Sequence, residues 1–367
     1  NEDVRAIARI TDKSIGSCLT CKSTAVPHMI EEMGDDYWGG NFNEDIWPKA
    51  EAMGHSPIGC SDCHDPQTMD LRVTRPSFIK AMESQGIDMS NPTKNDMRNY
   101  VCGQCHVEYY FAADNGEVTY PWANGFEPED MYEYYETTAK EQSFEKDWVH
   151  NVSGTPMLKS QHPDFETHIE GPHGEAGVTC SDCHMPYDRV DGKKKISSHW
   201  WTSPLKTMDQ SCATCHTNRD MEELKERVIG IQDKHMEALH KAEDISITSH
   251  YYVNKMITSG VSEEKIKQAQ EHIRKGQWFW DIVAAESSAG FHNPQGAMDS
   301  LMVSIEESNE AINLAIEELT KKGVNLEEVK TEIEKVKKAV YDEKDNFKKK
   351  EKAVNSYFPA QQPAPKK

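Results

Sequence analysis

The ten cysteines constrain this chain more than any other feature, because every one belongs to a Cys-x-x-Cys pair. The pairs are Cys18/Cys21, Cys60/Cys63, Cys102/Cys105, Cys180/Cys183 and Cys212/Cys215. A disulfide framework rarely gives every pair the same short spacing. This spacing is typical of a turn that presents two thiols to one bound group, such as a metal ion, a redox couple or a porphyrin. We therefore expect the pairs to hold prosthetic groups.

Four of the five pairs are followed directly by a histidine, namely His64, His106, His184 and His216. Cys-x-x-Cys-His is the attachment signature of c-type haem, in which two thioether bonds fix the porphyrin and the histidine binds its iron. Zinc, iron–sulfur or dithiol sites use such cysteines without requiring the four histidines. The sequence therefore predicts a multihaem cytochrome c.

The first pair differs from the others, because Cys18-Leu-Thr-Cys21 is followed by Lys22. We interpret it as a fifth haem site in which the lysine amine is the proximal ligand; the alternative is a dithiol unrelated to haem. An amine binds iron only in its neutral form, so the site must disfavour the ammonium. A haem whose ligand differs from those of four others is the natural place for chemistry, with the others passing electrons.

Charge and hydropathy narrow the functions that the chain can have. The formal net charge of -21 argues against nucleic acid as a partner, because phosphate binding requires a basic surface. No apolar run reaches the roughly 18 residues of a membrane-spanning helix. The chain begins with Asn1 and shows no leader peptide, so we expect that an N-terminal segment has been removed or is missing.

Sixteen histidines are present, and twelve remain when the four motif histidines are set aside. Relay haems usually carry a second axial ligand, whereas a catalytic haem keeps that position open. Local sequence alone does not choose among the twelve candidates for distal ligands. They are His28, His55, His150, His162, His168, His173, His199, His235, His240, His250, His272 and His292.

The order of the motifs resembles that of the pentahaem cytochrome c nitrite reductases, which reduce nitrite to ammonium. In that family one Cys-x-x-Cys-Lys motif precedes four Cys-x-x-Cys-His motifs. Two further segments are similar to family motifs, Cys-Gly-Gln-Cys-His-Val-Glu-Tyr-Tyr at 102–110 and Lys-Ser-Gln-His-Pro at 159–163. The resemblance extends from Asp3 to about Pro294. It implies a mainly α fold, with loops and short helices around the haems and long helices at the C-terminus.

The resemblance implies a catalytic set of Arg9, Lys22, Tyr109 and His162. Lys22 would bind the iron of the active-site haem, and the other three would line its open face. Arg5 is a weaker alternative to Arg9, since the spacer between Arg9 and the first cysteine is shorter than in the family. Nitrite would bind the iron through nitrogen and take up six electrons and eight protons.

The resemblance also implies one calcium ion beside the active site. Its ligands would come from Glu108, Tyr109, Lys159 and Gln161. We expect a carboxylate oxygen from Glu108, an amide oxygen from Gln161, and backbone carbonyl oxygens from Tyr109 and Lys159. Hard oxygen ligands of this kind are those that calcium prefers.

The distal ligands of the relay haems follow from the same resemblance. His199 would serve the second haem, His292 the fourth and His173 the fifth. The distal histidine of the third haem should lie before the first residue of this sequence. The alternative is a ligand from elsewhere in the chain, such as His28 or His55.

Periodicity divides the chain into three regions. Residues 1–219 hold all haem motifs and are expected to form the catalytic region, with a weak strand pair near Glu117–Tyr120. Residues 220–350 show helical spacing. The expected helices are Met221–Ile257, Ser262–Ser287, Gln295–Lys322 and Asn325–Lys350. Residues 351–367 are expected to form a flexible tail, because the segment from Pro359 is rich in proline and glutamine.

An apolar stripe recurs along the third of these helices at steps of three, four and seven residues. Its members are Leu301, Ile305, Ile312, Ile316 and Leu319. Such a stripe packs either against the haem region or against a second copy, and the resemblance favours a homodimer. The run at 193–195, three lysines, is expected to be a loop surface, with docking of a redox partner as the alternative.

Covalent haem attachment of this type occurs outside the bacterial cytoplasm, so a periplasmic location is expected, with association to the membrane through a partner or a missing anchor left open. The resemblance implies a quinol-oxidising membrane cytochrome or a soluble multihaem cytochrome as electron donor. It also implies hydroxylamine or sulfite as side substrates. The alternative function is that of a non-catalytic multihaem electron-transfer cytochrome.

Overall fold

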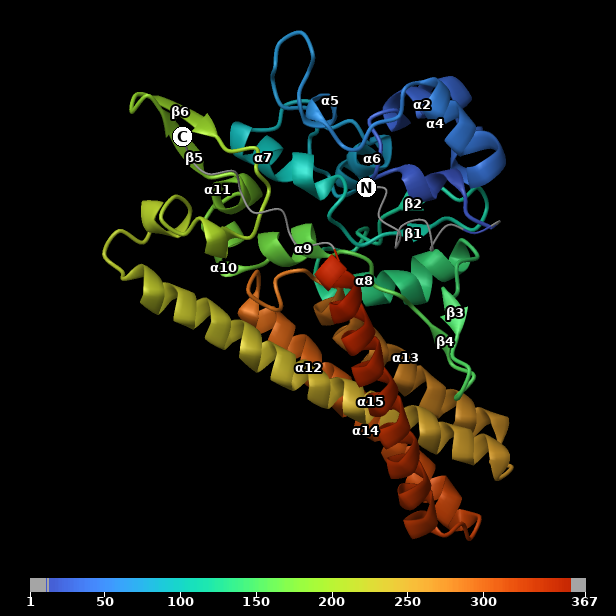
Figure 1. The fold of residues 1–367 in the computed structure, drawn as a ribbon. Helices are drawn as coiled ribbons and strands as arrows, with labels where there is room; N and C mark the ends of the chain where they lie inside the picture. The colour runs from blue at the N-terminus through green and yellow to red at the C-terminus, as the bar shows by residue number, and fades with distance from the viewer. Residues whose placement is uncertain (1–10, 12, 358–367) are drawn as a thin grey trace.

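A computed structural model describes residue 11 and residues 13–357, together with the side chains of these residues except 340 and 343–357. Short helices and loops form one lobe, and four long helices form an elongated layer beneath it (Figure 1). This arrangement confirms the expected mainly α fold. Within the described residues, no helix combines the length and the apolar character needed to cross a bilayer.

The short-helix lobe contains every Cys-x-x-Cys motif. Its helices are α2 (Val26–Met33), α3 (Asp36–Gly39), α4 (Trp47–Ala52), α5 (Cys60–Cys63), α6 (Pro76–Ser84), α7 (Lys94–Gly103), α8 (Pro128–Tyr134), α9 (Asp164–Ile169), α10 (Pro172–Glu175) and α11 (Cys180–His184). Two of these helices are themselves haem motifs, because each begins at the first cysteine of a pair. The motif spacing therefore corresponds to a single helical turn.

Three antiparallel hairpins interrupt the lobe. They are β1 (Tyr110–Phe111) with β2 (Val118–Thr119), β3 (Trp148–Val149) with β4 (Pro156–Met157), and β5 (Tyr187–Val190) with β6 (Lys194–Ser197). The first confirms the strand pair expected near Glu117–Tyr120. The other two were not predicted. The lysine run lies at the tip and second strand of the third hairpin, where Asp191 and Gly192 have φ of 52° and 68°, as a tight hairpin turn requires.

The long helices begin and end close to the expected residues. They are α12 (Met221–Thr258), α13 (Glu263–Ala285), α14 (Pro294–Lys321) and α15 (Leu326–Tyr357). The side chain of Asp220 caps α12 by accepting hydrogen bonds from two backbone amides of its first turn. The last helix passes beyond its expected end at Lys350 into the segment predicted as a tail. Residues 351–357 include Glu, Lys and Ala, which favour helix, so the helix continues until shortly before Pro359.

The buried face of α14 differs from the stripe predicted from the sequence. Leu301 and Leu319 are buried as expected, but small side chains lie between them on that face: Ser304, Ser308, Ala311 and Ala315. A Cβ at Gly276 of α13 would lie 2.8 Å from Ser308 Oγ, so small residues are needed where the two helices meet. The isoleucines of the predicted stripe are only partly buried and flank this contact.

One hydrophobic core joins the lobe to the long helices. Trp278 of α13 is fully buried, and its ring lies 5.2 Å from that of Tyr135 in the lobe. Its indole Nε1 donates a hydrogen bond to the backbone oxygen of Pro128 at 2.9 Å. Phe78, Trp122 and Phe165 continue the core with edge-on and tilted ring contacts. The lobe therefore rests on α13 through aromatic packing.

Two histidines stack where the β3–β4 hairpin meets α12. The rings of His150 and His250 lie 3.7 Å apart with an interplanar angle of 20°, and His250 Nδ1 is 2.8 Å from Ser153 Oγ. Burial, together with the neighbouring His150, lowers the pKa of His250 from 6.5 to about 3. Burial also lowers the pKa of His150. Both rings are therefore neutral in the folded protein near pH 7.

This pair predicts a loss of stability in mild acid. Below pH 6.5 the unfolded chain takes up a proton at His250 that the folded chain refuses until about pH 3. The free energy of unfolding should therefore fall by about 1.4 kcal/mol per pH unit in this window, or about 2 kcal/mol between pH 7 and pH 5. Chemical denaturation of the haem-loaded protein at both pH values checks this. His250→Asn should weaken the pH dependence, whereas His240→Asn, at an exposed site, should leave it unchanged.

Candidate active site

Local capping explains how two of the motifs form a helical turn. In α5 the carboxylate of Asp62 accepts a hydrogen bond from the backbone amide of Gly59 at 2.9 Å. In α11 the carboxylate of Asp182 accepts one from the amide of Thr179, also at 2.9 Å. Each aspartate is the third residue of a Cys-Ser-Asp-Cys-His motif and satisfies an amide close to the start of the helical turn. The residues inside these motifs therefore stabilise the turn that presents the thiols.

The thiols of different motifs lie next to one another. A hydrogen bond with Cys105 lowers the pKa of the Cys21 thiol to about 7. In the same way, a hydrogen bond with Cys180 lowers the pKa of Cys102. Cys102 and Cys105 both belong to the third motif, which is thus in contact with the first and the fourth. Groups attached to these three motifs would be close neighbours, as electron transfer between them requires.

The fifth motif lies at the surface of the lobe. The protein leaves Cys215, predicted to bind a haem, and His216 beside it exposed. Its pair is a 3₁₀ turn, η5 (Cys212–Thr214), rather than the α-helical turn of α5 and α11, and the turn ends just before Cys215. The protein therefore encloses Cys215 less than its partner Cys212, which is partly buried, and a haem attached here would lie at the edge of the lobe.

Cys60 of the second motif is the other exposed cysteine, and the remaining eight are partly buried. No disulfide joins any two of the ten cysteines. The equal spacing of the five pairs gave no sign that two thiols would be exposed. Burial depends on how the lobe packs around each motif, and the motif itself does not encode it.

Three of the motif histidines face a second histidine ring. The ring centroids are 6.1 Å apart for His64 and His199, 6.3 Å for His184 and His292, and 6.4 Å for His173 and His216. Two imidazoles that bind one metal ion from opposite sides at about 2 Å place their centroids roughly 6 Å apart. The structure thus brings together each pair that the sequence predicted, at a separation that fits an iron between the rings.

In three of these rings, Nδ1 forms a hydrogen bond with a backbone carbonyl oxygen. His64 Nδ1 lies 2.8 Å from the backbone oxygen of Met69, His184 Nδ1 lies 3.1 Å from that of Thr202, and His199 Nδ1 is 3.1 Å from the carbonyl at 197. A carbonyl oxygen only accepts, so each Nδ1 carries the proton and each Nε2 keeps a lone pair. This donor set fits haem iron, because it fixes the tautomer that binds a metal.

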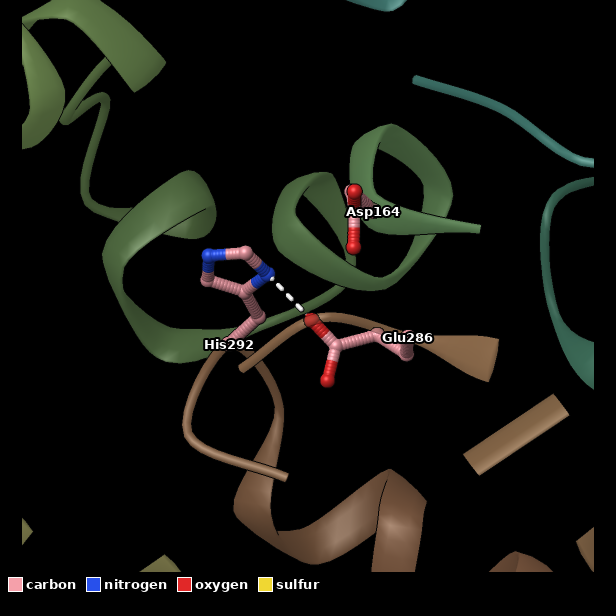
Figure 2. A group of neighbouring side chains, drawn as sticks. All are labelled: Asp164, Glu286 and His292. Atoms are coloured by element: carbon pink, nitrogen blue, oxygen red, sulfur yellow. Dashed lines mark ion pairs between the residues drawn. The ribbon is translucent and has the colours of Figure 1, made fainter. Parts of the chain in front are cut away.

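A carboxylate accepts a hydrogen bond from His106 in the same way, and a second carboxylate forms an ion pair with His292 (Figure 2). Asp164 Oδ2 lies 3.0 Å from His106 Nδ1, and Glu286 Oε1 lies 2.6 Å from His292 Nδ1. Asp164 also accepts a hydrogen bond from the amide of Ser287 at 2.7 Å, which ties α9 to the end of α13. Ligand atoms of Asp164, Glu286 and His292 lie within 4.8 Å of one another. Sequence analysis missed both carboxylates, since only the fold brings them to their histidines.

The predicted catalytic residues converge on the first motif. Lys22 is exposed, and its Nζ donates a hydrogen bond to the backbone oxygen of Cys18 at 2.9 Å. Burial lowers the pKa of His162 by more than a nearby carboxylate raises it, and the positive charge of Lys22 adds to the fall. Burial also raises the pKa of Tyr109, and the thiol of Cys21 adds to this effect. The predicted Arg9, with its alternative Arg5, lies outside the described residues.

The predicted calcium ligands surround a buried carboxylate. Glu108 is fully buried, and its two oxygens accept hydrogen bonds from Tyr135 Oη at 2.9 Å, Ser160 Oγ at 3.1 Å and the amide of Gln161. The amide nitrogen of the Gln161 side chain donates to the backbone oxygen of Lys159 at 3.3 Å. Burial raises the pKa of Glu108 well above its usual value. A cation beside it would remove this penalty, so the donor set fits calcium.

Two further carboxylates hold the segment that carries Lys159, and no motif pointed to either of them. Asp147 Oδ2 accepts a hydrogen bond from the amide of Lys159 at 2.8 Å. Asp281 of α13 forms an ion pair with Lys159 Nζ at 2.8 Å and accepts a hydrogen bond from the amide of Ser160 at 2.9 Å. Burial raises the pKa of Asp147 to about 6. The loop that ends in His162 is therefore anchored on the long-helix layer.

Comparison with known proteins bears on this arrangement. The chain is 45% identical over 316 residues to the cytochrome c nitrite reductase subunit NrfA of Nitratidesulfovibrio vulgaris, covering 82% of this chain and 60% of that protein. It is 42% identical over 279 residues to cytochrome c-552 of Bacteroides thetaiotaomicron, covering 76% and 54%. The chain thus spans less than two thirds of the length of these relatives.

A solved structure is also similar. The catalytic subunit NrfA of the cytochrome c nitrite reductase from Desulfovibrio desulfuricans superposes with a TM-score of 0.76 at 38% identity, over 84% of this chain and 69% of that one. That structure contains two calcium sites. The pattern that defines the Cytochrome c552 family matches residues 2–367. The chain therefore belongs to the cytochrome c552 family.

Proposed function

We propose that this protein reduces nitrite to ammonium at a haem held by Lys22. The observation that carries the proposal is the place of Lys22 directly after the first cysteine pair, near His162, with Tyr109 near Cys21 of the same motif. Similarity to two NrfA subunits supports it. Hydroxylamine and sulfite are proposed as side substrates.

Five haems c would be attached at the cysteine pairs, and their irons would supply nitrite binding and one-electron transfer. Lys22 would donate its amine lone pair to the first iron once deprotonated. The pairs His64/His199, His184/His292 and His173/His216 would hold three irons from both sides. His106 would hold the iron of the third haem, and Asp164 would fix the orientation of its ring.

At the Lys22 site, the substrate would be bound and protonated by His162, Tyr109 and Arg9. A His162 ring whose pKa is lowered is neutral near pH 7, so it can donate one hydrogen bond and then take up and pass on a proton. The phenol of Tyr109, whose pKa is raised, stays protonated and donates a hydrogen bond to a nitrite oxygen. Arg9 would add a fixed positive charge to attract the anion.

A calcium ion would hold this pocket in shape. Glu108 and Gln161 would supply side-chain oxygens, and Tyr109 and Lys159 would supply backbone carbonyls. Both Tyr109 and His162 lie next to one of these ligands in sequence. An ion at this point would therefore fix both catalytic side chains and add positive potential for an anionic substrate.

The location, the electron donor and the oligomeric state of the protein are proposed as well. We propose a periplasmic protein that receives electrons from a quinol-oxidising membrane cytochrome or a soluble multihaem cytochrome. We also propose a homodimer built on the long helices, where Met302 of α14 is 63% exposed and Ile257 of α12 is 41% exposed.

Electron paramagnetic resonance of the oxidised protein tests the function. The wild type should show one high-spin haem whose signal changes when nitrite is added. Lys22→His should keep five haems per chain but alter that signal, because the proximal ligand has changed. A wild type with only low-spin, nitrite-insensitive haems would instead identify a non-catalytic electron-transfer cytochrome.

A further inference from the structure

A single buried arginine contacts the backbone on both sides of Lys22. The side chain of Arg75 is fully buried. Its Nε donates a hydrogen bond to the backbone oxygen of Thr20 at 2.8 Å, and its Nη2 donates one to the backbone oxygen of Ser23 at 3.1 Å. These two carbonyls flank the Cys21–Lys22 dipeptide. The planar guanidinium therefore holds the turn from which Lys22 projects.

The same guanidinium reaches the second haem motif. Arg75 Nη1 lies 2.7 Å from Asp62 Oδ1, and both side chains are almost completely buried. Asp62 is the residue that caps the α5 turn between Cys60 and Cys63. Because the ion pair is sealed from water, its geometry is fixed and it adds no net charge to the lobe. The first and second motifs are thus joined through one side chain.

Gln104 extends the connection to the third motif. It stands between Cys102 and Cys105 and is 1% exposed. Its Oε1 accepts a hydrogen bond from the backbone amide of Arg75 at 3.2 Å, while its Nε2 donates to the backbone oxygen of Asp62 at 3.2 Å. Arg75, Asp62 and Gln104 therefore form one buried network that contacts three haem motifs, and two of its members occupy the variable positions inside those motifs.

We propose that Arg75 is a positioning residue for the Lys22 site, which sets where the lysine amine stands relative to the neighbouring motifs. The inference rests on the proposed role of Lys22 as iron ligand. The side chain of Lys22 is exposed and donates its hydrogen bond within its own motif, so its position depends on its backbone. An error of about 1 Å at a reacting group can reduce turnover about a hundredfold.

Lysine is the informative replacement at position 75. A lysine ammonium keeps the charge opposite Asp62 but cannot donate in one plane to two carbonyls and a carboxylate at once. We expect Arg75→Lys to retain five haems, to weaken or shift the high-spin signal assigned to the Lys22 haem, and to lower kcat for nitrite about tenfold to a hundredfold at nearly constant KM. The low-spin signals of the other haems should stay as in the wild type.

Arg98→Lys is the matched control. Arg98 donates to Ser181 Oγ and Asp182 Oδ1, both at 2.6 Å, and so holds the fourth motif in the way that Arg75 holds the second. Because these hydrogen bonds go to the fourth motif and not to the Lys22 turn, its replacement should leave the high-spin signal unchanged. A milder test is Gln104→Met, which keeps the volume and the Arg75–Asp62 pair; it should shift the same signal by less than Arg75→Lys does.

The outcomes separate this inference from the proposed function. An Arg75→Lys protein with an unchanged high-spin signal and unchanged kcat overturns the positioning role, and so does an equal change in all five haem signals. If Arg75→Lys fails to fold, an unshifted high-spin signal in Gln104→Met overturns it as well. A wild type that lacks any nitrite-sensitive high-spin haem contradicts the proposed function instead.

Discussion

Replacing His162 with alanine is expected to lower kcat for nitrite by about a hundredfold to ten-thousandfold, the usual contribution of a positioned acid or base. Burial is the main cause of the low pKa of this imidazole, so near neutral pH the ring can donate a hydrogen bond and accept a proton in turn. Alanine removes both abilities. Steady-state turnover with a reduced dye as electron donor measures the effect, with haem content determined in parallel.

The control for this prediction is His240→Ala, because His240 is an exposed histidine of α12 that lies beside a glutamate of the same helix. Its turnover should equal that of the wild type. If His162→Ala also keeps wild-type turnover with five haems bound, catalysis does not take place at the Lys22 site. A loss of haem would point to a structural role for His162 instead.

The sequence predicted the long-helix layer well because each helix carries its own start and stop signals. Asp220 caps α12 and Pro294 opens α14, and both signals are local. The buried face of α14 was predicted less well. Its serines and alanines allow close approach to α13 at Gly276, and a search for large apolar residues selects the neighbouring isoleucines instead.

At the site, the residues that would bind haem could be predicted from the sequence, whereas the groups that orient them could not. The motifs are covalent signatures that can be recognised at fixed spacing, and the resemblance assigned His173, His199 and His292 to partners that the structure places opposite them. The groups that orient those rings escaped notice. Asp164 lies fifty-eight residues from His106 in sequence, and no spacing rule connects them.

The sequence also gave no sign that Arg75 contacts the turn that carries Lys22. Its sequence neighbours, Thr74 and Pro76, indicate only that a helix begins there, which α6 does. That its side chain turns back to the carbonyls around Lys22 depends on how three motifs pack. Sequence therefore identifies which residues can bind iron, whereas the buried polar contacts decide where those residues stand.

Glu108→Gln is expected to abolish calcium binding and to lower nitrite turnover about tenfold to a hundredfold, the usual effect of losing a ligand or its support at a metal site. Glutamine keeps the shape of the side chain, but it has a single acceptor oxygen where Glu108 uses one oxygen for Tyr135 and the other for Ser160, and it removes the buried negative charge. Calcium per chain, measured by atomic emission, should fall from one to zero. Chelation of the wild type should reproduce the loss of turnover.

The matched control is Glu145→Gln. The side chain of Glu145 is 68% exposed, and this residue is not one of the predicted calcium ligands. It should keep both the ion and the turnover. Because a neutral glutamine carries no charge for a cation to offset, the Glu108→Gln protein should also lose the stabilisation that added calcium gives the wild type in thermal unfolding. Equal calcium content in Glu108→Gln and the wild type would place the ion elsewhere.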